Sequence, residues 1–136
     1  MTSSEPPPAP QPPGSPAPPL PAPLFRVAVV GPCASVKSTL VAALRAAGYD
    51  ARHPAQEHSF VKDMWRRRVD PDVLIYLDLS HEAYRKRRPK DDAGPEYLEM
   101  QRERLAHARE YADLVVDTSE LSAEAVRELV LRALAD

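Results

Sequence analysis

The sequence has a single cysteine, Cys33, and no long run of apolar residues. One cysteine cannot form an intramolecular disulfide bond or a cysteine-rich metal site. No apolar run approaches the roughly 18 residues that a membrane-spanning helix needs, and the N-terminal MTSSEPPPAP lacks the basic start and apolar core of a signal peptide. The formal net charge of −2 gives no overall attraction to nucleic acids or anionic membranes. These absences predict a cytoplasmic protein that binds neither.

Proline is abundant, but eleven of the sixteen prolines lie in the first 24 residues. Such a Pro/Ala/Ser composition favours extended, solvated polyproline II chain and cannot form a core. We expect residues 1–24 to be a disordered tail, with a ligand for an SH3-like or WW-like protein partner as the alternative. Residues 25–136 then form one small domain, in a chain that is 43% hydrophobic and 28% charged.

After the tail, strand patterns and helix patterns alternate along the chain. Apolar and β-branched runs predict strands at 25–30, 49–53, 73–79 and 114–117. Helical periodicity and capping residues predict helices at 37–47, 57–68, 81–88, 95–112 and from Ser122 towards the C-terminus. This alternation predicts a three-layer α/β fold, with a parallel sheet of about four strands and helices on both faces. Ligands of such sheets bind at the carboxyl ends of the strands, which is where the loop after Val30 lies.

That loop resembles the phosphate-binding motif G-x-x-x-x-G-K-[ST], in which backbone N–H groups and a helix N-terminus bind phosphates. Gly31, Lys37 and Ser38 match the motif, and the loop joins a buried strand to an amphipathic helix, as the motif requires. In the motif, the lysine neutralises the outer phosphates and the Ser/Thr hydroxyl, here Ser38, helps to hold Mg²⁺. The predicted nucleotide-binding residues are Gly31, Pro32, Cys33, Ala34, Ser35, Val36, Lys37, Ser38 and Thr39.

Val36 departs from the motif, because glycine belongs at this position. Glycine serves where backbone approaches a phosphate or adopts a positive φ, whereas a β-branched residue resists that conformation. Strain of this kind costs about 1–3 kcal/mol, and 3 kcal/mol is over a hundredfold in affinity. Val36 therefore predicts weakened or absent nucleotide binding.

Three stretches together resemble the P-loop nucleoside and nucleotide kinase family of the thymidylate kinase, dephospho-coenzyme A kinase and shikimate kinase type. They are VAVVGPCASVKSTLVAAL, PDVLIYLDLSHEAYRKRR and RLAHAREYADLVVDTSELSAEAV, and the resemblance covers residues 25–135. It implies transfer of the γ-phosphoryl group of ATP to an unidentified small acceptor. Lys37 and the loop would hold the phosphates, and Arg85, Arg87 and Arg88 would supply charge from a lid, with Arg88 favoured. Only about 25 residues separate the first helix from VLIYLD, which leaves little room for an acceptor site.

Other candidate residues have two interpretations each. Glu57, near the end of a strand, is a candidate to bind Mg²⁺ through water or to deprotonate an acceptor, or it stabilises a helix N-terminus. Asp78 ends an apolar strand as a metal-binding acid does, although the corresponding kinase strand does not normally supply that ligand. Cys33 is a small loop residue or a redox-sensitive thiol. Trp65 with Arg66, Arg67 and Arg68 suggests a nucleic-acid patch, but core packing of Trp65 fits its helical stripe better.

The sequence thus predicts an ATP-binding P-loop protein, either a compact kinase weakened by Val36 or a catalytically inactive regulatory or interaction module of the same fold. A nucleotide-hydrolysing switch fits less well, because the sequence shows no water-positioning or base-recognition motif.

Overall fold

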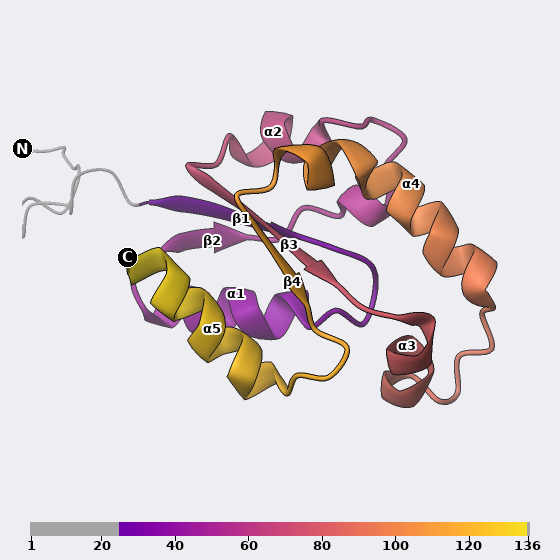
Figure 1. Cartoon of the computed structure of the whole chain (residues 1–136). Helices are drawn as coiled ribbons and strands as arrows, with labels where there is room; N and C mark the ends of the chain where they lie inside the picture. The colour runs from indigo at the N-terminus through magenta and orange to yellow at the C-terminus, as the bar shows by residue number, and fades with distance from the viewer. Residues whose placement is uncertain (1–24, 136) are drawn as a thin grey trace, which may run out of the picture.

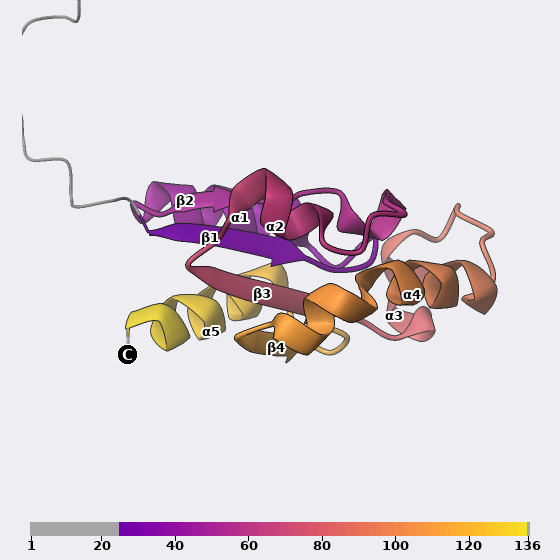
Figure 2. The same cartoon turned by 90° about the horizontal axis from the view of Figure 1, so that it is seen from above.

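Four parallel strands form the centre of the structure, a computed structural model that describes residues 25–135. The strands are β1 (Arg26–Val30), β2 (Asp50–Arg52), β3 (Val73–Asp78) and β4 (Leu114–Asp117). Their order in the sheet is β2-β1-β3-β4, and each neighbouring pair is parallel (Figure 2). The predicted small parallel sheet is confirmed, and β1 and β3, its two most apolar strands, occupy the centre.

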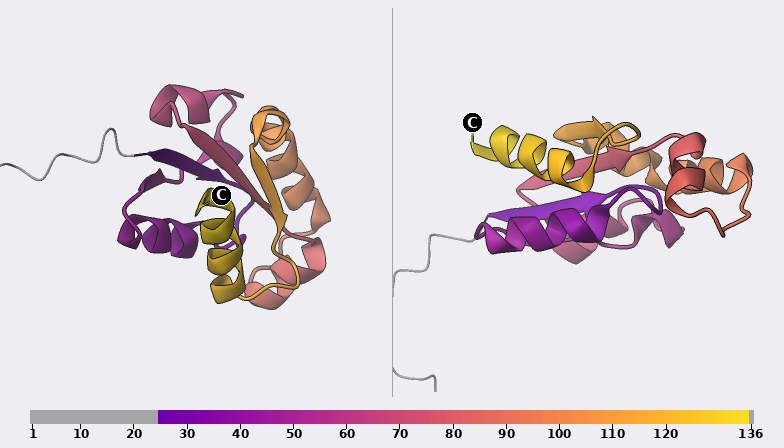
Figure 3. Two further views of the ribbon diagram at one scale, coloured as in Figure 1. Left: turned by 60° about the vertical axis from the view of Figure 1, so that its left-hand side comes forward. Right: turned by 90° about the horizontal axis from the view of Figure 1, so that it is seen from below.

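Helices cover both faces of the sheet and make the fold three-layered (Figures 1 and 3). The helices α1 (Lys37–Ala46) and α5 (Ala123–Ala135) lie on one face, and α2 (Met64–Val69) and α4 (Pro95–Tyr111) lie on the other. The short α3 (His81–Arg87) lies beyond the carboxyl end of β3 (Figure 1). The predicted α/β class is therefore confirmed, and the predicted site loop lies at the carboxyl edge of the sheet.

Strand β1 is buried on both faces because its side chains alternate between two cores. Val27 and Val29 pack with residues of α1 and α5, whereas Ala28 and Val30 pack with residues of α2 and α4. All four are fully buried. Since successive side chains of a strand point to opposite faces, an uninterrupted apolar run is what a strand between two helical layers requires.

The prediction of a single helix at 57–68 is wrong. The chain instead forms a 3₁₀ turn, η1 (Gln56–His58), and then α2 from Met64, with irregular backbone between them. The Gln56 side chain replaces the missing helical hydrogen bonds: its amide donates to Val61 O at 2.8 Å and its oxygen accepts from Trp65 N at 2.9 Å. Side chains that satisfy the local backbone compete with a helix in this way. Phe60, in the irregular segment before α2, is 88% exposed.

Three further predictions concern Trp65, membrane-spanning helices and the Pro-rich segment. Trp65 is 5% exposed and packs in the core over Ala28 and Leu74, which confirms the core interpretation. None of the helices among residues 25–135 is long and apolar enough to cross a membrane. The Pro-rich segment 1–24 lies outside the described residues, so its disorder and its protein partner stay predictions.

Candidate phosphate-binding site

The loop between β1 and α1 begins where the backbones of β1 and β3 pass very close together. A Cβ atom on Gly31 would lie 2.1 Å from the carbonyl oxygen of Leu77 and 2.9 Å from Ser35 Oγ. Neither the strand backbone nor the buried Ser35 can move aside cheaply. Glycine is therefore required at position 31, independently of any ligand, and this contact fixes where the loop leaves the sheet.

Two residues of the loop, Ala34 and Val36, adopt left-handed backbone conformations. Their φ angles are 67° and 66°. This region is unfavourable for residues with a Cβ, and most of all for a β-branched one. The loop thus has the positive φ at position 36 that the motif assigns to glycine. The backbone strain expected at Val36 is therefore present in the folded protein without any ligand.

Helix α1 begins without a side-chain cap. Its N-cap residue is Val36, which makes no side-chain hydrogen bond to the helix. By contrast, Ser80 Oγ accepts from Ala83 N at the start of α3, and Ser122 Oγ accepts from Ala125 N at the start of α5. The first N–H groups of a helix have no partner within it, and they carry partial positive charge. The N-terminus of α1 therefore suits an anion better than those of α3 and α5.

Lys37 is folded back into the protein. Its ammonium group donates to Gly31 O at 2.7 Å and to Pro32 O at 2.9 Å, and it forms an ion pair with Glu57 Oε2 at 3.0 Å. An ammonium has three N–H donors, so these three acceptors match its capacity. Glu57, which comes from η1, is as buried as Lys37, and its second oxygen, Oε1, has no hydrogen-bond partner among the described residues.

Most of the predicted site residues line one pocket of about 570 Å³. Its lining includes the loop residues 33–38 together with Glu57, His58 and Arg88, and the side chain of Ser38 is exposed there. Gly31, Pro32 and Thr39 do not line it. The structure therefore brings the predicted loop, Glu57 and Arg88 together, and it supports Ser38 as a reachable hydroxyl in the first turn of α1.

Arg87, rather than the favoured Arg88, is the arginine of α3 that contacts the loop. Its guanidinium donates to Ala34 O at 2.7 Å and to Thr118 Oγ1 at 3.0 Å, and also to the carbonyl oxygen of Thr118. Thr118, just after β4, is fully buried. Arg87 thus joins the phosphate-type loop to the end of β4. Both arginines line the pocket, and Arg88 is the exposed one. Arg85 lies outside this lining, on the pocket between α3 and α4.

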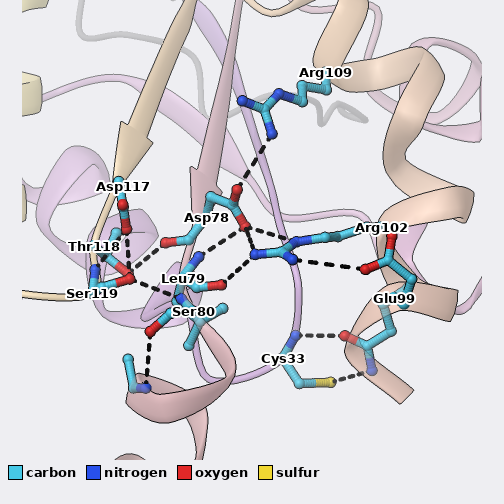
Figure 4. A network of polar contacts seen from close by, with 12 residues as sticks. Cys33, Asp78, Leu79, Ser80, Glu99, Arg102, Arg109, Asp117, Thr118 and Ser119 are labelled. Atoms are coloured by element: carbon cyan, nitrogen blue, oxygen red, sulfur yellow. Dashed lines mark hydrogen bonds and ion pairs between the residues drawn. The ribbon is translucent and has the colours of Figure 1, made fainter. Parts of the chain in front are cut away.

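Asp78 at the end of β3 is held by two arginines of α4 (Figure 4). Its Oδ1 accepts from Leu79 N at 2.8 Å and pairs with Arg102 at 3.3 Å, and its Oδ2 pairs with Arg109 at 3.3 Å. The carboxylate is outside the lining of the loop pocket. Its role here is to fasten α4 to the end of β3, which argues against the metal-binding interpretation.

Two further contacts near the loop were not expected from the sequence. Gln101 of α4 is fully buried, accepts a hydrogen bond from Cys33 N at 2.9 Å and donates to Cys33 Sγ at 3.3 Å. Thr118 Oγ1 donates to Asp78 O at 2.8 Å, which links β3 and β4. Neither residue belongs to a motif, and the sequence shows only that Gln101 interrupts the apolar side of a helix.

A hydrogen bond joins α3 to the loop that leads to α4: Tyr84 Oη donates to Asp91 Oδ2 at 2.6 Å. Burial, with help from this carboxylate, raises the pKa of Tyr84 to about 12, and burial likewise raises the pKa of Tyr76 to about 12. An unfolded tyrosine ionises near pH 10, so both groups favour the folded state below pH 10 and lose that contribution as pH rises towards 12.

We therefore expect the free energy of unfolding to fall between pH 10 and about 12, and Tyr84→Phe to make that fall shallower. Urea denaturation at a series of pH values measures it. Tyr111→Phe, at a side chain that is 52% exposed, is the control and should leave the slope unchanged. If Tyr84→Phe left the pH dependence of the free energy of unfolding unaltered, that result would contradict the raised pKa of Tyr84.

No protein-family model matches the chain. A protein of Trichlorobacter lovleyi (strain ATCC BAA-1151 / DSM 17278 / SZ) described as "Nucleotide-binding protein" is 42% identical over 70 residues. The match covers 45% of this chain and only 25% of that protein.

Proposed function

We propose that this chain binds a nucleotide, with the phosphates at residues 31–39. The observation that carries the proposal is the uncapped N-terminus of the ten-residue helix α1, reached by a tight loop from a buried strand and flanked by the Lys37 ammonium. Backbone N–H groups and the helix dipole favour a polyanion at this position, and the Lys37 ammonium would add to this attraction once it leaves Glu57. The name of the Trichlorobacter relative supports the same ligand class.

The residues of the loop fit ATP with Mg²⁺ only in part. Ser38 offers an exposed hydroxyl at the helix start, and the buried Ser35 Oγ has no partner within the described chain. Mg²⁺ bound through Ser38 would neutralise charge on the outer phosphate oxygens. Val36 opposes this fit, since its branched side chain lines the pocket where the motif has only hydrogen.

Phosphoryl transfer to a small acceptor is the finer part of the proposal. Lys37 would stabilise charge on the transferring group, Arg88 would approach it from α3, and Glu57 would act on the acceptor hydroxyl. The position of all three on one pocket supports these roles. The pairing of Lys37 with Glu57 instead favours the alternative, a non-catalytic module, because each group must leave the other before it can act.

Calorimetric titration with Mg-ATP tests the proposal. We expect weak binding by the natural sequence and at least about tenfold weaker binding by Lys37→Ala, since one charge-assisted hydrogen bond contributes about 1.5–3 kcal/mol. Lys62→Ala, at an exposed lysine outside the pocket, is the matched control and should bind normally. If neither the natural sequence nor Val36→Gly binds Mg-ATP, the nucleotide proposal is wrong.

Glu57→Gln separates the two interpretations of Glu57. In the absence of divalent cations, pyrophosphate should bind the variant several-fold more tightly, because the carboxylate that holds Lys37 and repels the anion is gone. Calorimetry in the presence of a chelator measures this. Weaker binding by the variant would show that Glu57 supports the phosphate site rather than competing with it.

A further inference from the structure

A cysteine, a histidine and a carboxylate meet at the mouth of the loop pocket. Cys33 Sγ lies 3.6 Å from His58 Nε2, and His58 Nε2 lies 3.9 Å from Glu57 Oε2. The three ligand atoms lie within 4.8 Å of one another. We propose that Cys33, Glu57 and His58 form a binding site for a transition-metal dication, Zn²⁺ foremost, separate from the Mg²⁺ role of Ser38.

The spacing suits tetrahedral zinc. With Zn–S near 2.3 Å and Zn–N near 2.0 Å, tetrahedral angles place sulfur and nitrogen ligands about 3.5 Å apart. The Cys33 to His58 separation of 3.6 Å already has this value. Nitrogen and oxygen ligands at about 2.0–2.1 Å from zinc lie about 3.3 Å apart, so the 3.9 Å from His58 Nε2 to Glu57 Oε2 would shorten by about 0.6 Å on binding. Three protein ligands with a fourth position open to water is the coordination of accessible zinc sites.

One carboxylate oxygen of Glu57 has no hydrogen-bond partner among the described residues, although the side chain is buried. The Glu57 side chain is 7% exposed, and Lys37 pairs with its Oε2 while Oε1 has no partner in the described part of the chain. A buried carboxylate oxygen without a hydrogen bond is costly. The oxygen measured against His58 is Oε2, the one paired with Lys37, so a dication bound by this carboxylate would share Oε2 with the lysine or bind Oε1, which would then gain a partner.

The surroundings also hold the sulfur in position. Gln101 uses both ends of its amide on Cys33: the oxygen accepts from Cys33 N, and the Nε2 group donates to Sγ. Residues that orient metal ligands in this way commonly contribute 10–100-fold to metal affinity. On binding, the thiol would release its proton to solvent and coordinate as thiolate. A thiolate and an imidazole select Zn²⁺ over Mg²⁺, which prefers oxygen ligands.

Binding of Co²⁺ and Zn²⁺ to the reduced, metal-free full chain without nucleotide tests the site. We expect one equivalent of Co²⁺ to give a thiolate-to-metal charge-transfer band and the visible bands of tetrahedral cobalt, both removed by Zn²⁺. Cys33→Ser should abolish the charge-transfer band. His58→Ala, at an exposed side chain, and Glu57→Gln should each weaken Zn²⁺ binding at least about tenfold, measured against a chromophoric chelator.

His53→Ala is the matched control, because His53 lines the same pocket but lies outside the three-residue cluster. It should bind Zn²⁺ as the natural chain does, with circular dichroism confirming that all variants are folded. Octahedral cobalt bands, a charge-transfer band that survives in folded Cys33→Ser, or equal losses in His53→Ala and His58→Ala would overturn the assignment. None of these readouts depends on whether the loop binds nucleotide.

Discussion

Arg87→Ala is expected to lower the free energy of unfolding by about 3 kcal/mol, whereas Arg88→Ala should change it by less than about 0.5 kcal/mol. Arg87 donates to Ala34 O and to both oxygens of Thr118, so its removal leaves acceptors in three interactions without their donor. Hydrogen bonds from a charged group contribute about 1.5–3 kcal/mol each and are not additive within a cluster. Arg88 is exposed, and surface substitutions are usually small in effect.

Urea denaturation of the two variants measures this difference. Arg87 is the last residue of α3 and Arg88 is the C-cap residue that follows it, and the two side chains have the same charge and size, so the comparison isolates the contacts of Arg87. Arg87→Lys should recover only part of the loss, because an ammonium cannot reproduce the planar fork of donors. Equal stabilities of Arg87→Ala and Arg88→Ala would contradict the contact between α3, the loop and β4.

Val36→Gly is expected to raise the affinity for Mg-ATP by about 10–100-fold while changing stability by less than about 1 kcal/mol. In the folded state, Val36 already has a φ of 66°. Relief of this strain would stabilise the variant by about 1–2 kcal/mol. Glycine adds about 0.5–1 kcal/mol of unfolded-state entropy, and the packing of the half-buried valine against the core is lost. These terms nearly cancel.

The gain in affinity has two origins. Strain at Val36 favours other loop conformations over the one that binds phosphate. Each 1.4 kcal/mol of free energy needed to hold the binding conformation lowers the apparent affinity tenfold. The branched side chain also occupies space beside the phosphates. Calorimetry gives the affinity, and urea denaturation gives the stability. Val36→Ala is the control: it removes the branching but keeps a Cβ at positive φ, so it should recover only part of the gain. Unchanged affinity in Val36→Gly would mean that position 36 does not limit binding.

The sequence predicted the layers of the fold because each layer has a local signal. A short apolar run such as 73–79, with Pro71 before it and Ser80 after it, favours a buried strand. Ser80, Pro95 and Ser122 mark helix starts that the structure contains. The error at 57–68 arose where a buried polar side chain, Gln56, satisfies backbone groups that a helix would otherwise satisfy. Helical periodicity carries no information about such a contact.

The sequence predicted the loop, which is contiguous, and it named Glu57 and Arg88, which line the same pocket, but it did not predict the contacts that hold the loop in place. Residues 31–39 form a motif, but the contacts that shape their surroundings join residues far apart, such as Cys33 with Gln101, 68 positions on, and Ala34 with Arg87, 53 positions on. Only the packing of α3 and α4 against the end of the sheet brings these pairs together. The left-handed backbone at Val36 was inferred as a condition of the motif, and the structure has it.

The most direct test of phosphate binding by the loop is a titration of the ¹⁵N-labelled chain with Mg-ATP, followed through the backbone amide resonances. The largest shift changes should fall on Ala34 to Thr39, with Val36→Gly showing the same residues at lower ATP concentration. Changes centred elsewhere, such as on Asp78 and α4, or no change in either chain at saturating ATP, would contradict the proposal that this loop binds a nucleotide.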